Sequence, residues 1–261
     1  MILGEFGNTK LDQYTLYVPD TREKDQKTEA AVRITDEREA VKVIIPERVS
    51  KNRPQRQNST VVSAGQKDVR MEKSFEELAQ MASSIVMIAV HDETGEVIGT
   101  GSGIMIGKSG YILTNHHVVA RGRSYSVRIE DDETAYRSDQ VIKYNSVLDM
   151  AVIRIDRKLT PLTIYDGRKK LVRGQKVVAI GSPLGLFNSV SDGIISGFRN
   201  IRDTDMIQFT APISPGSSGG AVLNVYGEVI GISTAGIDSG QNINLAVGYE
   251  DILMFTKGFV G

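Results

Sequence analysis

The stretch that decides the fold is Gly216-Ser217-Ser218-Gly219-Gly220, in which two serines lie between glycines. Earlier in the chain come Thr114-Asn-His-His117 and then Asp149, each at the edge of an apolar run. Serine becomes a nucleophile when a base of near-neutral pKa removes its proton, which favours histidine, and a carboxylate then fixes the histidine tautomer. Glycines beside the serine let backbone amides turn toward an oxyanion. These residue types together predict a nucleophilic hydrolase.

The same pentapeptide also satisfies the G-x-S-x-G pattern of α/β-hydrolases, whose triad follows the order Ser, Asp or Glu, His. All three histidines of this chain, His91, His116 and His117, precede Ser218. An α/β-hydrolase could therefore not complete its triad here. The order His, Asp, Ser is the chymotrypsin-like one.

The rest of the chain is rich in β signals. Short apolar runs separated by glycine-rich turns recur at roughly ten-residue spacing, which favours an all-β sandwich or a pair of barrels over a βαβ fold. The expected strands are Ile85–Val90, Ile98–Ile106, Tyr111–Leu113, Val127–Ile129, Ala151–Ile155, Lys176–Ile180, Gly193–Gly197, Met206–Thr210, Ala221–Leu223, Val229–Ser233 and Leu245–Tyr249. A capping box at Ser74-Phe-Glu-Glu77 predicts the start of a short N-terminal helix, and Glu250–Lys257 is expected to form a closing helix.

Composition narrows the class of protein. The chain has 261 residues, of which 31 are basic and 32 acidic, so the charge balance points to neither nucleic acid nor membrane as a partner. It has no cysteine, hence no disulfide or thiol chemistry. The stretch Met1-Ile-Leu-Gly-Glu-Phe-Gly7 does not resemble a signal peptide, and the longest apolar run, Ile85–Val90, is too short to cross a bilayer. We therefore expect a cytoplasmic protein.

The composition also changes along the chain. Residues 1–47 form a charged N-terminal extension with β-like stretches at Tyr14–Val18 and Ala40–Ile45, and this extension could bind a protein partner. Residues 48–72 read as a polar linker; its four basic residues between 48 and 56 lack the aromatic neighbours of a nucleic-acid site. Residues 73–261 are predicted to form the main domain, with a first barrel at about 85–160 and a second at about 172–249.

Longer blocks of sequence carry a specific resemblance. Thr100-Gly-Ser-Gly-Ile-Met-Ile-Gly107 followed by Gly110-Tyr-Ile-Leu-Thr-Asn-His-His-Val-Val119 resembles the histidine block of HtrA/Deg-type trypsin-like serine proteases. Asp149-Met-Ala-Val-Ile-Arg-Ile155 resembles their aspartate block, and the stretch from Gln208 to Val222 resembles their serine block. Further similar blocks are Gly174–Gly185 and Gly227–Ala235. The blocks follow the family's order over about residues 73–258, so a chymotrypsin-like double β-barrel and serine endopeptidase activity are implied.

The resemblance also implies a role for each candidate residue. Its pattern Thr-x-x-His makes His117 the general base and leaves His116 a supporting neighbour, a choice that the residues alone leave open. Asp149 would orient His117, and Ser218 would be the nucleophile. The backbone amides of Gly216 and Ser218 would form the oxyanion hole. His91 is expected to be an ordinary exposed histidine, and no metal or cofactor is implied.

Two positions depart from the digestive relatives. Those enzymes carry an aspartate before the nucleophile that pairs with a freed N-terminus, whereas this chain has Ser217, so we expect activity without such cleavage. The position that the resemblance gives to the floor of the specificity pocket is Pro212. Glu228, the only acid in residues 207–237, is expected to be solvated. Because no acid is then expected in the pocket, we expect cleavage after small or medium apolar residues.

Several hypotheses remain beside this one. The chain could be an inactive protease-like scaffold that binds polypeptide, recruited through residues 1–47. Residues 48–70 could be self-cleaved, for example near Val61 and Val62. From the sequence we expect no PDZ domain of the kind that often follows the protease in HtrA/Deg proteins, and trimerisation is suggested by the resemblance alone.

Overall fold

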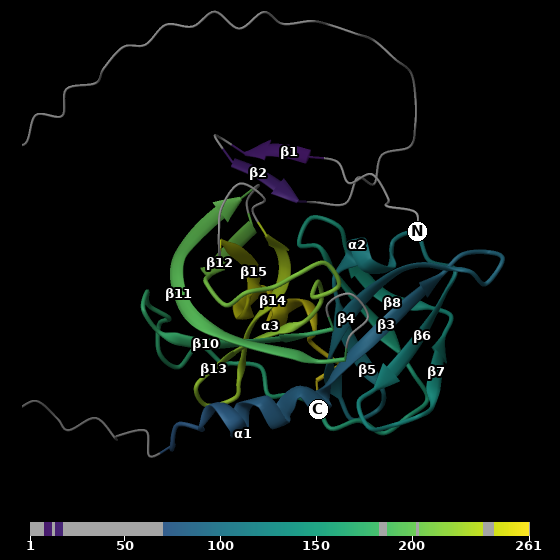
Figure 1. Ribbon diagram of the computed structural model, residues 1–261, viewed down its shortest axis with the longest axis horizontal. Coiled ribbons are helices and arrows are strands. Elements are labelled where there is room, and N and C mark those ends of the chain that lie inside the picture. The colour runs from purple at the N-terminus through teal and green to yellow at the C-terminus, as the bar shows by residue number, and fades with distance from the viewer. Residues whose placement is uncertain are drawn as a thin grey trace, which may run out of the picture. The chain divides into compact units, whose positions relative to one another are not determined.

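The computed structural model describes residues 8–11, 14–17, 70–182, 187–201, 204–236 and 243–260, with the backbone alone for 8–11, 14–17 and 235–236. Most of the described chain forms two antiparallel β assemblies, an open sheet and a closed barrel (Figure 1). A separate pair, β1 (Asn8–Leu11) and β2 (Tyr14–Tyr17), is also antiparallel. The expected stretch Ala40–Ile45 lies outside the described residues.

The first assembly is a sheet of seven strands in the order β7-β6-β3-β4-β5-β9-β8. Its strands are β3 (Ile85–His91), β4 (Val97–Gly107), β5 (Tyr111–Thr114), β6 (Ser124–Ile129), β7 (Ala135–Ser138), β8 (Val141–Asn145) and β9 (Met150–Arg154). The turn from β4 to β5 contains Gly110 at a φ of 92°, a conformation that glycine adopts without steric cost. Because β7 and β8 do not pair, this barrel stays open along one side.

The second assembly is a closed barrel of six strands in the order β10-β11-β12-β15-β14-β13. Its strands are β10 (Lys176–Gly181), β11 (Ser189–Ile201), β12 (Thr204–Phe209), β13 (Ala221–Asn224), β14 (Val229–Gly236) and β15 (Asn244–Gly248). The two assemblies together make the chymotrypsin-like double barrel that the sequence predicts. Closure leaves this barrel without the unpaired edge strands that promote aggregation.

Short helices flank the two barrels. The helix α1 (Phe75–Ala79) begins at the predicted capping box, where Glu77 N donates to Ser74 Oγ and Ser74 N donates to the Glu77 carboxylate at 2.7 Å. It continues into the 3₁₀ helix η1 (Gln80–Ser84). The helix α2 (His116–Val119) follows β5, and α3 (Tyr249–Phe255) closes the described fold. No helix among the described residues is both long and apolar enough to span a membrane.

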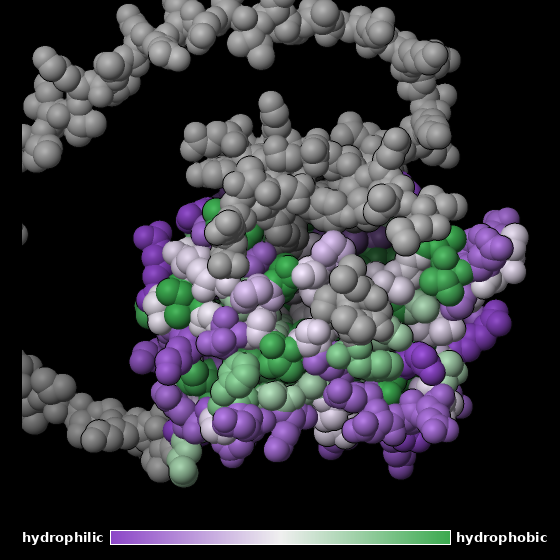
Figure 2. All heavy atoms as spheres, in the orientation of Figure 1, coloured by the Kyte–Doolittle hydropathy of each residue, from purple (hydrophilic) through white to green (hydrophobic). Residues whose placement is uncertain are grey.

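The hydrophobic core runs continuously from the sheet into the closed barrel. Ile85 and Ile104 of the sheet belong to the same buried cluster as Ile180 and Phe209 of the barrel. Both faces of β9 and β15 are covered, so their residues are buried in continuous runs rather than in alternation. On the face shown in Figure 2, hydrophobic side chains form small separate groups among hydrophilic ones. This shared core fixes the position of one barrel against the other.

Each of the eleven expected strands of residues 85–249 overlaps an observed one, but β7 and β8 are not among the expected strands. Both are short edge strands, with sequences AYRS and VIKYN, and β8 alternates half-buried and exposed residues. With one solvated face and few apolar residues, such strands give a weak sequence signal. The helix α2 is also not among the expected elements, because four residues are too few to show a helical period.

Candidate active site

His117 and Asp149 make contact at two points. The His117 Nδ1 atom lies 2.7 Å from Asp149 Oδ2, and the His117 backbone N–H donates to Asp149 Oδ1 at 2.9 Å. The ring comes from α2 and the carboxylate from the residue immediately before β9, where Thr114 of β5 pairs with Ala151. Because adjacent strands hold both ends, the orientation of the imidazole is set by the backbone as well as by the side chains.

This contact determines the tautomer of His117. The carboxylate of Asp149 can only accept hydrogen bonds when ionised, so the proton of a neutral His117 ring must lie on Nδ1. The other ring nitrogen, Nε2, then carries a free lone pair. A histidine in this form can accept a proton from a neighbouring hydroxyl.

Asp149 is further held by two residues that sequence reasoning missed. Thr234 of β14 donates its hydroxyl to Asp149 Oδ2 at 2.6 Å, and the Asn115 side-chain amide donates to the Asp149 carbonyl at 2.8 Å. Burial raises the pKa of Asp149, but the hydrogen bonds from His117 and Thr234 outweigh it and leave the pKa below its ordinary value. The Asp149 backbone has a φ of 50°, a left-handed conformation that aspartate tolerates better than most residues.

The segment Ser214–Gly220, which we call the nucleophile loop, is built from two consecutive turns. Ser217 N donates to Ser214 O and Gly220 N to Ser217 O, each at 2.9 Å. Gly216 and Gly219 occupy the third position of these turns with φ values of 97° and 87°. Hydrogen bonds of this kind with a positive φ at the third position are typical of type II turns, for which Pro215 is a favoured second residue. Ser218 is thereby the second residue of the second turn, directly before Gly219.

The nucleophile loop is tied to the strand that holds Asp149. Gly219 N donates to Ser233 O and Ser233 N to Gly220 O, each at 2.9 Å, and the next residue is Thr234, the partner of Asp149. Ser218 O also accepts a hydrogen bond of 2.8 Å from Ser102 N. Ser233 and Thr234 of β14 therefore connect the loop to the His117–Asp149 pair.

Two amides of the nucleophile loop are left free. Within the described part of the chain, neither Gly216 N nor Ser218 N donates a hydrogen bond. In the described part of the chain, the His117 ring and the Ser218 hydroxyl also form no hydrogen bond with each other. Such bonds are often long in unliganded enzymes and shorten when substrate binds.

A small cavity lies beside the loop. It has a volume of about 250 Å³ and carries no charged side chain in its lining. The lining residues are Ala179, Ile180 and Gly181 of β10, Ser189 and Ser191 of β11, Pro212, Ile213, Ser214, Ser217 and Ser233. Pro212, the residue expected at the floor of a specificity pocket, is one of these lining residues. The Ser233 hydroxyl is buried and has no partner among the described residues.

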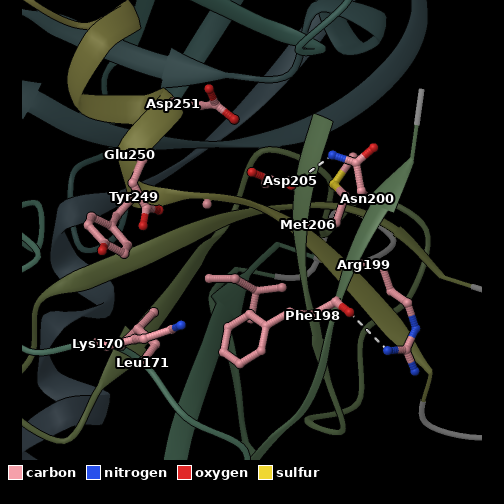
Figure 3. A pocket seen from close by; sticks show the side chains of 12 residues that line it. Lys170, Leu171, Phe198, Arg199, Asn200, Asp205, Met206, Tyr249, Glu250 and Asp251 are labelled. Carbon is pink, nitrogen blue, oxygen red and sulfur yellow. Dashed lines mark hydrogen bonds between the residues drawn. The ribbon is translucent and has the colours of Figure 1, made fainter. Parts of the chain in front are cut away.

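A larger cavity, about 430 Å³ in volume, lies elsewhere on the closed barrel (Figure 3). Its lining includes Phe198 and Met206 together with the acids Asp205, Glu250 and Asp251. None of His117, Asp149 and Ser218 lines it. Burial and the neighbouring acids Asp205 and Glu250 raise the pKa of Asp251. The smaller cavity is lined by Ser214 and Ser217 of the nucleophile loop, whereas no residue of that loop lines the larger one.

The other histidines have separate environments. The His116 ring stacks on Tyr144 at a centroid distance of 4.9 Å and makes no contact with the Asp149 carboxylate. His91 is half-buried, with one ring nitrogen 3.0 Å from Gly95 O and the other 2.8 Å from Ser126 Oγ. The expectation that His91 is simply exposed is therefore wrong, since its ring joins β3 to β6.

Glu228 also differs from expectation. It is 7% exposed, not solvated, and its carboxylate binds Arg168, Arg70 and the Asn224 side-chain amide at 2.8 to 3.0 Å. Arginine is the residue best suited to pair with a buried carboxylate, because its planar fork donates several hydrogen bonds. Glu228 does not line the small cavity.

Comparison with known proteins gives consistent results. A family model described as a trypsin-like peptidase domain matches residues 101–232, just over half of the chain. The anti-sigma-I factor RsgI9 of Acetivibrio thermocellus is 33% identical over 183 residues, which cover 69% of this chain and 25% of RsgI9. Serine protease HTRA1 of Xenopus laevis is 33% identical over 211 residues, which cover 73% of this chain and 45% of HTRA1. The chain therefore spans less than half the length of either relative.

A solved structure resembles the fold as well. The crystal structure of the serine endoprotease from Yersinia pestis superposes with a TM-score of 0.64 and 26% sequence identity. The match covers 73% of this chain and 68% of that chain.

Proposed function

Because the chain belongs to the trypsin-like peptidase family, and within it to the HtrA/Deg type, we propose that it is a serine endopeptidase. The observation that carries the proposal is the two-point contact of Asp149 with His117, which leaves His117 Nε2 without a hydrogen-bond partner among the described residues. Ser218 attacks the scissile carbonyl, and His117 Nε2 takes its proton. Asp149 holds the ring and stabilises the imidazolium that forms.

The next steps use two backbone amides of the nucleophile loop and the same histidine. The free amides of Gly216 and Ser218 donate to the oxyanion of the tetrahedral intermediate. His117 then returns its proton to the leaving amine, and an acyl group remains on the Ser218 oxygen. Water attacks this ester with His117 again acting as base, which releases the acid and restores the serine. No metal or cofactor takes part in this sequence of steps.

The substrate preference that we propose rests on the small cavity. Its walls are glycine, alanine, serine, isoleucine and proline side chains, and none of them could neutralise an arginine or a lysine. We therefore propose cleavage after small or medium apolar residues. A library of peptides varied at the residue before the scissile bond should give a profile dominated by such residues. A profile dominated by arginine or lysine would contradict the assignment of this cavity.

Labelling with a fluorophosphonate probe tests the mechanism directly. The wild-type chain should be labelled at Ser218, and Ser218→Ala should abolish labelling and lower kcat by a factor of about a million if the three residues act as a unit. An unlabelled wild-type protein that still binds polypeptide would instead support the inactive scaffold.

The adjacent histidines provide a matched control. His117→Ala should cost kcat about as much as Ser218→Ala, whereas His116→Ala removes a ring of the same size that faces Tyr144 and should leave labelling intact. Equal losses in the two histidine variants would show that the helix, not His117, had been disrupted.

A further inference from the structure

Ser102 connects the two barrels directly behind the nucleophile loop. It lies in β4 of the open sheet and is fully buried. Its hydroxyl lies 2.8 Å from Gly216 O and 2.8 Å from Ser182 N, and its backbone N–H donates to Ser218 O at 2.8 Å. Its own carbonyl accepts a hydrogen bond of 2.7 Å from the Thr114 hydroxyl. One residue of the first barrel therefore holds the loop at both Gly216 and Ser218.

The direction of these hydrogen bonds follows from their chemistry. The Ser182 backbone N–H can only donate, so the Ser102 oxygen accepts from it. The Gly216 carbonyl can only accept, so the Ser102 hydroxyl proton points to it. Both capacities of the hydroxyl are used. In a site without water, loss of this hydroxyl would leave two buried backbone groups without partners.

The peptide unit between Gly216 and Ser217 is fixed at both ends. Its carbonyl is held by Ser102, and its N–H donates to Ser214 O at 2.9 Å. Because a peptide unit is planar, these two bonds set its orientation. The preceding unit carries the Gly216 N–H, and within the described residues neither its carbonyl on Pro215 nor its N–H is hydrogen-bonded. That unit can turn about the torsions of Gly216, which glycine leaves unrestricted.

The two amides proposed for the oxyanion hole therefore differ in the hydrogen bonds that fix their orientation. The Ser218 N–H is fixed within its loop, since the Ser217 carbonyl of the same peptide unit accepts from Gly220 N. The Gly216 N–H depends on the neighbouring unit that Ser102 anchors. In relatives with an aspartate before the nucleophile, an ion pair with the freed N-terminus supports this loop, and Ser217 cannot make one.

We propose that Ser102 is a positioning residue that orients the Gly216 amide from the opposite barrel, and that this uncharged anchor takes the place of an N-terminal ion pair. The inference rests on the proposed function, because it names the residue that holds the proposed oxyanion hole in place. It predicts that removal of one hydroxyl outside the His117–Asp149–Ser218 set selectively weakens stabilisation of the transition state.

The kinetic test compares Ser102→Ala with Ser182→Ala. Ser182 is also fully buried, and its hydroxyl contacts Asn188 Oδ1 at 3.3 Å instead of the loop. With a fluorogenic peptide, Ser102→Ala should lower kcat by about ten- to a hundredfold with KM nearly unchanged, since an oxyanion donor acts in the transition state. Ser182→Ala should stay within about twofold of the wild type. Equal kcat in Ser102→Ala and the wild type, or equal losses in the two variants, would overturn the proposal.

A second readout does not depend on catalysis. Hydrogen–deuterium exchange of the peptide that spans residues 210–220 should be faster in Ser102→Ala than in the wild type and unchanged in Ser182→Ala. If the wild type proved inert to fluorophosphonate while this difference was found, the proposed function would fail and the positioning role would stand. Unchanged exchange in Ser102→Ala would overturn the positioning role whatever the activity.

Discussion

The His117–Asp149 pair and the nucleophile loop lie in different barrels and are held by different forces. The pair is joined by short hydrogen bonds to an ionised carboxylate, reinforced by Thr234 and Asn115. The loop contains no charged side chain; backbone turns, two glycines at positive φ and the Ser102 hydroxyl give it its shape. Loss of charge should therefore disable the pair, whereas added bulk or a lost hydroxyl should disable the loop.

The largest of these effects is expected at the pair. Asp149→Asn preserves the shape of the side chain but presents an amide that can donate, so His117 can be held with its proton on Nε2 and is then unable to act as a base. We expect kcat to fall by about 10⁴-fold with little change in KM. Steady-state kinetics with a peptide substrate measures both constants. A loss below tenfold would show that Asp149 does not set the tautomer.

A smaller effect, on folding stability, is expected in the loop. Gly219 and Gly95 both have a φ of 87°, but a Cβ on Gly219 would lie 2.1 Å from Ser102 O, whereas one on Gly95 would meet nothing within 4 Å. Gly95→Ala should therefore lower the free energy of unfolding by about 1–2 kcal/mol, the cost of the left-handed conformation alone. Gly219→Ala should lower it by more and also abolish labelling of Ser218. Denaturant titration compares the two variants, and equal destabilisation would show that the close approach to Ser102 is unimportant.

The remaining effect is expected at Thr234, and it depends on pH. Because the folded-state pKa of Asp149 lies below the unfolded value of about 3.9, its ionisation stabilises the fold above that pH, and this contribution is lost as the pH falls through the folded pKa. Thr234→Val removes one bond to the carboxylate and should lower the free energy of unfolding by about 1.5–3 kcal/mol at pH 7. The difference from the wild type should shrink below about pH 4.

The variant Ser233→Ala, which removes the neighbouring hydroxyl, is the control for this prediction. It is buried and has no partner among the described residues, so Ser233→Ala should change stability little and by the same amount at each pH. Chemical denaturation of both variants at pH 7 and at lower pH gives the comparison. A Thr234→Val difference that stayed constant down to pH 3 would mean that the hydroxyl does not stabilise the ionised form of Asp149.

Much of the fold could be predicted because its signals are local. Apolar runs bounded by glycine gave the central strands, and Ser74 with Glu77 gave the start of α1. The edge strands β7 and β8 could not be predicted, since half-exposed residues leave no clear period. Glu228 was assigned to solvent because it follows Gly227 in an expected hairpin turn. Its burial depends on Arg168 and Arg70, which reach it from distant segments.

The sequence by itself determined which residue types carry the chemistry, their order along the chain, and the glycines that shape the nucleophile loop. It left the choice between His116 and His117 to a resemblance, because adjacent residues of a helix point in different directions. Only the tertiary structure decided that Thr234 binds Asp149 across 85 residues and that Ser102 holds Gly216 across 114. Those pairings arise when the two barrels pack on a shared core, and no local pattern of residues records how two distant surfaces meet.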